Sequence, residues 1–89
     1  MIWEAETENK FKSFISKIPV FHRHITESVV RGQAERIASH RNCSQVEEKD
    51  VIAAFFSYVP SPFYSMMIRI LDQTGFDYKK YGFPKNNKN

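Results

Sequence analysis

Residues 16–24, SKIPVFHRH, mark the point where one helical pattern stops and the next begins. Proline has a fixed φ, lacks a backbone N–H and pushes the preceding residue out of the α region. Ile18 therefore belongs to a turn, whereas Pro19 or Val20 can open a helix, where the missing N–H has no cost. The stretch predicts a sharp corner between two helices, with Arg23 tethering the turn.

Apolar residues continue at helical spacing on both sides of this corner. Before it, about residues 4 to 17 predict an amphipathic helix. After it, about residues 20 to 41 predict the longest helix of the chain, with Phe21 and Ile25 among its inward side chains. Gly32 lies inside this helix at a cost of about 1 kcal/mol relative to alanine, and a close approach of another helix would explain its presence.

Two further helices are predicted downstream. Ser44 and Glu47 have the spacing of a capping box, which places a helix start at Ser44 or just after it. Ser61 and Pro62 are typical of the beginning of a fourth helix over about residues 62 to 74, with Phe63, Met66, Met67, Ile70 and Leu71 buried.

The aromatic residues 76 to 84, which follow Gly75, are expected to fold back on the helices as a strand-like arm. The predicted fold class is all-α: a small bundle of about four helices with a long second helix and an aromatic C-terminal arm. Residues 1–84 would form a single helical domain, and residues 85–89 a disordered tail.

Composition limits the class of protein. The chain has 89 residues, enough large apolar side chains for one modest core, and a single cysteine, which is typical of a reducing, cytoplasmic compartment. The acidic N-terminal residues do not resemble a signal peptide, and no apolar stretch reaches the length of a membrane span. We therefore expect a cytoplasmic protein that is not inserted in a membrane.

The residues that could carry chemistry do not converge on a catalytic or metal site. His22 and His24 are two residues apart, so on a helix they point in different directions, and His40 lies several turns further along. Cys43 is the one candidate nucleophile, and a lone cysteine in a turn is more often a small, half-buried residue. We predict no catalytic residue, no metal and no cofactor, and therefore no enzyme activity.

Two kinds of binding site are open. Met66 and Met67, together with Phe55 and Phe56, could present an adaptable apolar surface to a protein partner, to a second copy of the chain, or to a flat apolar ligand such as a tetrapyrrole; the plainer interpretation of such a stripe is core.

The formal net charge of +3 raises the second possibility, a nucleic acid. The excess positive charge lies in the C-terminal residues, because the body of the chain carries equal numbers of acidic and basic side chains. Four lysines there, interleaved with aromatic residues, could contact a nucleic-acid strand, although a solvated terminus is the interpretation we favour. They are Lys79, Lys80, Lys85 and Lys88.

Three segments together resemble a known family: WEAE at 3–6, KIPVFHRH at 17–24, and VVRGQAERIASHRNCSQVEEKDVIAAF at 29–55. Over about residues 3 to 54 they are similar to the PCP_red family, a small C-terminal domain appended to the nitrogenase-like catalytic chain of light-independent protochlorophyllide reductase. The resemblance implies an all-helical accessory domain, or a stand-alone relative, that interacts with other proteins. It marks Arg23 as the polar motif residue for partner binding. Reductase activity is not implied, because one cysteine cannot supply the ligands of an iron–sulfur cluster.

A second resemblance concerns the order of helices. A short helix, a long helix and a third that begins with EKDVIAAF, residues 48–55, are similar to the histone fold. That resemblance implies a dimeric, DNA-binding protein as the alternative function. The two interpretations differ in their partner, since the first requires a protein and the second a nucleic acid.

Overall fold

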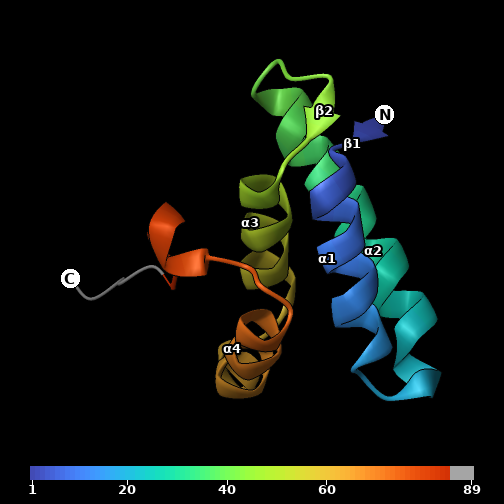
Figure 1. Cartoon of the computed structure of the whole chain (residues 1–89), viewed down its shortest axis with the longest axis vertical. Coiled ribbons are helices and arrows are strands. Elements are labelled where there is room, and N and C mark those ends of the chain that lie inside the picture. The colour runs from blue at the N-terminus through green and yellow to red at the C-terminus, as the bar shows by residue number, and fades with distance from the viewer. Residues whose placement is uncertain (85–89) are drawn as a thin grey trace.

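The computed structural model describes residues 1–84, which form an all-α domain, as the sequence predicts (Figure 1). Four α-helices account for most of it, with two very short strands and two 3₁₀ segments. In chain order these elements are β1 (Ile2–Trp3), α1 (Ala5–Ser16), α2 (Val20–His40), β2 (Gln45–Val46), α3 (Glu48–Tyr58), η1 (Ser61–Phe63), α4 (Tyr64–Gln73) and η2 (Tyr78–Tyr81).

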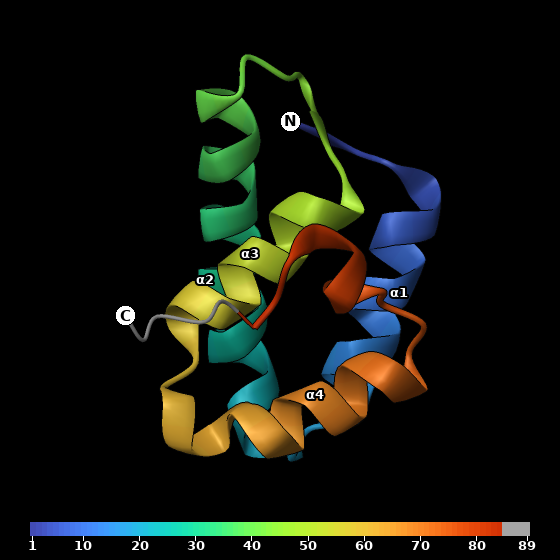
Figure 2. The ribbon, with the colours of Figure 1, turned by 90° about the vertical axis from the view of Figure 1, so that its left-hand side faces the viewer.

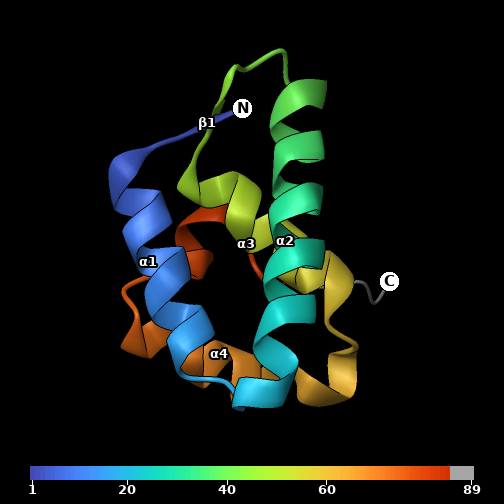
Figure 3. The ribbon, with the colours of Figure 1, turned by 90° about the vertical axis from the view of Figure 1, so that its right-hand side faces the viewer.

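The bundle has two different ends. Helices α1 and α2 run along the length of the molecule, α3 slants across between them, and α4 lies across the end at which α1 turns into α2 (Figures 2 and 3). We call this the corner end; it comprises residues 17–25 and residues 58–67. At the opposite end β1 pairs with β2 in parallel, close to the C-terminus of α2 and the N-terminus of α3. We call this the strand end; it comprises β1 and residues 41–50.

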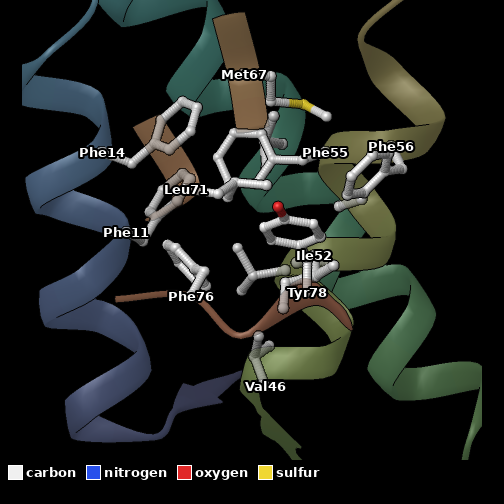
Figure 4. Packing of buried hydrophobic residues seen from close by; sticks show 14 of the residues in the cluster. Phe11, Phe14, Val46, Ile52, Phe55, Phe56, Met67, Leu71, Phe76 and Tyr78 are labelled. Atoms are coloured by element: carbon white, nitrogen blue, oxygen red, sulfur yellow. The ribbon is translucent and has the colours of Figure 1, made fainter. Parts of the chain in front are cut away.

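Aromatic rings from three elements form the centre of the core (Figure 4). The ring of Phe55 on α3 lies 4.2 Å from that of Phe14 and 6.0 Å from that of Phe11, both on α1. Phe76, which follows α4, closes the cluster at 6.2 Å from Phe55. Such tilted and edge-on pairs add to the stabilisation that the burial of apolar area provides. Phe55 of α3 therefore holds together α1 and the segment after α4.

The corner between α1 and α2 is confirmed. Pro19 is the N-cap residue of α2, and helical geometry begins at Val20. Arg23 donates from Nε to the carbonyl of Ile18 and from a terminal nitrogen to the carbonyl of Ser16, each at 2.9 Å. Carbonyl groups at a helix C-terminus have no partner within the helix, so the arginine side chain supplies one and fixes the turn.

The start of α3 differs from the prediction. Ser44 does not cap the helix, because Gln45 and Val46 are drawn into the parallel pairing with Ile2 and Trp3. The capping box lies three residues later than predicted, where the backbone N–H of Glu47 donates to Asp50 Oδ2 at 2.9 Å. The pairing takes priority since it leaves Val46 fully buried.

Trp3 fastens the first strand to α2. Its indole N–H donates to Glu35 at 2.9 Å, and the guanidinium of Arg31 lies 4.5 Å from the centre of its ring. Arg31 also pairs with Glu8 on α1 at 3.2 Å and with Glu27 one turn away at 3.5 Å. The strand end is therefore held by polar contacts among three elements.

Several side chains predicted to be buried are exposed. Phe21 and Ile25 on α2 are 79% and 56% exposed, and Phe63 and Met66 at the start of α4 are 53% and 49% exposed. The predicted close approach at Gly32 is also wrong, because no atom outside its own helix lies within 4 Å of the position that a Cβ would take. Part of α2 is thus left uncovered by the other elements of residues 1–84.

The C-terminal arm folds back on the helices, as predicted, but in another conformation. Gly75 has φ +86°, a backbone conformation that favours glycine, and it turns the chain after α4. Phe76 and Tyr78 are then buried, and the arm forms η2 instead of a strand-like segment. The predicted disordered tail, residues 85–89, lies outside the described residues.

Candidate functional site

An apolar groove of about 460 Å³ opens at the corner end, and we call it the corner groove. The corner between α1 and α2 forms one side, and α4 with the segment before it forms the other. The side chains that define these sides are Ile18, Pro19 and His22 on the first, and Phe63, Met66 and Ile70 on the second. The groove therefore lies between two segments that are far apart in the sequence.

The core supplies the floor of the groove. Phe14, Phe55 and Met67 line it, and all three are almost completely buried. Phe55 and Met67 were predicted as partner-binding residues; here they shape the floor, while half-exposed Met66 is the predicted residue that a partner could contact directly. Methionine side chains are flexible and polarizable, so the groove can adapt to what enters it.

Phe56 lies apart from the other predicted residues. It lines a second hollow of about 580 Å³, near Tyr64 and Phe83. The ring of Phe83 stacks on it with centroids 5.0 Å apart, and the hydroxyl of Tyr64 donates to its carbonyl oxygen at 2.8 Å. Phe56 is 8% exposed, so its ring is used to dock the C-terminal arm.

Arg23 does not line the groove. Its guanidinium is engaged with the two backbone carbonyls of the corner. The neighbouring residue His22 lines the groove instead, and its ring lies 4.4 Å from that of Phe21. Arg23 thus acts as a positioning residue for one side of the groove.

The exposed apolar residues of α2 were missed because they were assigned to the buried face. Val30, Ala34 and Ala38 define that face, since all three are fully buried. Phe21 precedes Val30 by nine residues, which is two and a half turns at 3.6 residues per turn. The spacing thus places Phe21 opposite the core, and that signal is present in the sequence.

The two stretches that line the groove contain basic residues and no acidic residue. Every residue that lines the groove comes from residues 9–26 or residues 51–71, and neither stretch contains an aspartate or glutamate. Lys17 and Arg69 are exposed basic residues of these stretches. Two carboxylates lie just beyond the stretches: Glu27 is paired with Arg31, and Asp72 is two residues after Ile70, which places it on the other side of α4 from that lining residue.

The strand end has a different chemistry. Arg41 donates from Nε to Asp50 Oδ1 at 2.8 Å and from a terminal nitrogen to Asp50 Oδ2 at 2.6 Å. This pairing raises the pKa of Arg41 above its already high usual value. Asp50 is 1% exposed and also accepts the N–H of Glu47. Both carboxylate oxygens of Asp50 accept hydrogen bonds from groups of the same chain, so the pair connects the end of α2 to α3.

The remaining chemical candidates do not come together. Among residues 1–84 no group of three His, Cys, Asp or Glu side chains could hold a metal ion. Cys43 donates from Sγ to the carbonyl of Gln45 at 3.2 Å, at the strand end and away from the corner groove. The histidines and the cysteine therefore share no site in this part of the chain.

The lysines of the nucleic-acid alternative fall in two groups. Lys79 and Lys80 lie on η2, where Lys80 Nζ is 5.4 Å from the ring of Tyr81. Lys80 borders a hollow that it shares with Glu4, Glu47 and Glu48. These carboxylates would repel a phosphate backbone, so this geometry does not favour DNA. Lys85 and Lys88 lie outside the described residues.

Within residues 1–84 no single helix is long and apolar enough to cross a bilayer, although α3 and residues 61–73, bent by 116° relative to each other, pass the same criteria as a pair. Comparison with known proteins gives no match to any family model, curated protein or solved structure.

Proposed function

We propose that this chain is a non-catalytic accessory domain that binds a helix of a partner protein in the corner groove. One observation carries the proposal: large apolar side chains that would normally be buried line a groove at one end of the molecule and are exposed. Phe63 is 53% exposed, Met66 49% and Tyr58 38%. Contiguous exposed apolar surface of this kind is typical of interaction sites.

The shape of the groove favours a helix over a small molecule. Small-molecule sites usually surround most of their ligand, whereas the sides of this groove are exposed, as the values for Phe63 and Met66 show. A helix that carries apolar residues at positions i, i+3 and i+7 fits an open groove between two ridges. A flat apolar ligand such as a tetrapyrrole, or a second copy of the chain, is an alternative occupant that the experiment below distinguishes.

The resemblance to the PCP_red family supports an accessory role. Residues that carry the resemblance hold the domain together: Trp3 bonds to Glu35, Arg23 fixes the corner, and Asp50 pairs with Arg41. A motif of this kind describes a structural module and not a reaction centre. We accordingly propose a role beside a larger enzyme, in a reducing compartment such as the cytoplasm, where the free thiol of Cys43 is compatible.

The experiment is a selection of displayed helical peptides on the immobilised chain. Met66→Asp serves for counter-selection, because it puts a charge on the rim of the groove. Ser65→Asp is the matched control: it adds the same charge on the neighbouring exposed residue of α4, outside the set that lines the groove. We expect peptides that bind the unchanged chain and Ser65→Asp but lose binding to Met66→Asp.

The outcome distinguishes the possible occupants. A selection that yields no peptide sensitive to Met66→Asp would contradict the proposal. A mass in solution of two chains that reverts to one in Met66→Asp would show that a second copy occupies the groove. Fluorescence quenching by a metal-free porphyrin, lost in the same variant but not in Ser65→Asp, would assign the groove to a flat ligand.

A further inference from the structure

We infer that the partner helix is acidic: an amphipathic helix whose apolar face enters the corner groove and whose aspartate or glutamate side chains lie along the edges of that face. This inference rests on the proposed function and adds the charge of the partner. It is drawn from the distribution of charged residues around the groove.

The two stretches that line the groove contribute basic residues only. Lys17 lies at the corner beside Ile18, and Arg69 lies one helical turn after Met66, both exposed. Neither makes an ion pair with another side chain of residues 1–84, whereas Lys10 and Arg31 are paired with glutamates. Two cations without a carboxylate partner in this part of the chain therefore lie next to groove-lining residues, Lys17 beside Ile18 and Arg69 beside Ile70.

A further cationic group adds to the positive charge of the corner end. The guanidinium of Arg23 bonds to neutral carbonyl groups, so its charge is not cancelled by a carboxylate. An anionic partner is attracted to this end by Lys17, Arg23 and Arg69 together.

The strand end shows where the carboxylates are. Glu4, Glu47 and Glu48 border one hollow there, and Asp50 lies behind them. These carboxylates meet the cations Lys10, Arg41 and Lys80, so charges of both signs lie together at the strand end. Residues 17–25 and 58–67 of the corner end contain basic residues and no carboxylate. Such unpaired charge orients a charged partner before contact and rejects one of the wrong sign.

The concave shape favours a protein helix over an anionic membrane. Pro19 and Phe63 are exposed on the two sides, and the floor formed by Phe14, Phe55 and Met67 lies between them. A flat bilayer surface would contact the projecting side chains and leave the floor uncovered. A helix is convex and carries side chains that reach the floor, so it can fill the groove.

The test uses three synthetic peptides of about 18 residues, long enough to form a helix on binding. All three share one leucine face, and their flanking positions are glutamate, glutamine or lysine. Fluorescence anisotropy measures the affinity of each at low and at physiological salt. Because two exposed ion pairs are lost and replaced by repulsion, we expect the glutamate peptide to bind about tenfold more tightly than the lysine peptide, with a smaller difference at higher salt.

A charge-reversal variant sharpens the result. Lys17→Glu combined with Arg69→Glu should abolish the preference for the glutamate peptide or reverse it. Lys49→Glu combined with Lys79→Glu changes the net charge equally at exposed positions that do not line the groove, so this control should keep the preference.

Three results would overturn the inference. Equal binding of the three peptides, all lost in Met66→Asp, would leave the proposed function intact and remove the acidic partner. Tighter binding to phosphatidylglycerol vesicles than to any peptide would assign the corner end to a membrane surface. The third result combines two findings: none of the three peptides binds, and the display selection has produced groove-dependent peptides without acidic residues. It would show that the groove recognises shape alone.

Discussion

The strand end and the corner end use the side chains of their helices in opposite ways. At the strand end, charged side chains of α2 and α3 satisfy one another, as Arg41 and Asp50 do with two hydrogen bonds. At the corner end, apolar side chains of α2 and α4 meet solvent, as the exposure of Phe21 shows. The contrast teaches that charged side chains at one end are paired within the chain, whereas large apolar side chains at the other end stay exposed.

The largest expected effect on the free energy of unfolding comes from a substitution at the strand end. Arg41→Ala leaves the carboxylate of Asp50, 1% exposed, without its charged partner, and such a loss destabilises a domain by about 3 kcal/mol. Urea unfolding followed by circular dichroism measures it. Arg36→Ala, an exposed residue of the same helix, should change the free energy of unfolding by less than about 0.5 kcal/mol; equal effects would show that the pair is not needed.

The next effect concerns the corner itself. Arg23→Ala removes two hydrogen bonds from a charged donor, both 2.9 Å long, and should lower the free energy of unfolding by about 1–2 kcal/mol. His24→Ala, at the next and exposed position, is the control for the change in helix propensity. An Arg23→Ala protein as stable as the control would mean that Pro19 sets the turn without help.

A smaller effect of opposite sign tests the uncovered part of α2. A Cβ at Gly32 would meet no atom within 4 Å, so Gly32→Ala should stabilise the protein by about 0.5–1 kcal/mol through helix propensity. Thermal unfolding at several protein concentrations measures it. A destabilisation that grows with concentration would show that a second chain packs against this face.

The smallest expected effect is at the corner end. Phe21→Ser and Met66→Asp each change an exposed side chain, and both should leave the free energy of unfolding within about 0.5 kcal/mol of the unchanged protein. Asp is also tolerated at residue 66 because it lies in the first turn of α4, near the positive end of the helix dipole. Urea unfolding of each variant measures this, and a loss above about 2 kcal/mol, typical of core residues, would contradict the exposure.

The helices were largely predictable from the sequence, for local reasons. Pro19 fixes the corner by sterics alone, and Gly75 ends α4 by its backbone freedom, so no distant residue is needed to predict either. The start of α3 was not predictable in this way. Ser44 has a suitable capping pattern, but the pairing of Gln45 with Ile2 overrides it, and that contact spans half of the chain.

The candidate site was predictable only in part. The sequence marks Met66 as an apolar residue, and its position at the exposed rim depends on where α4 crosses the bundle. Phe55 and Met67 were predicted to contact a partner, yet they are buried, because packing decides which members of an apolar stripe face the core. The family resemblance and the function it implies stay predictions.

The parallel pairing at the strand end has a consequence for local opening motions. The first residues of most domains fray, and their amides exchange readily with solvent. Here the amide of Glu4 donates to the carbonyl of Val46 at 2.9 Å, and Val46 is fully buried against the bundle. Hydrogen–deuterium exchange at Glu4 should therefore report on the detachment of β1 from β2, and this one amide serves as a probe of opening at the strand end.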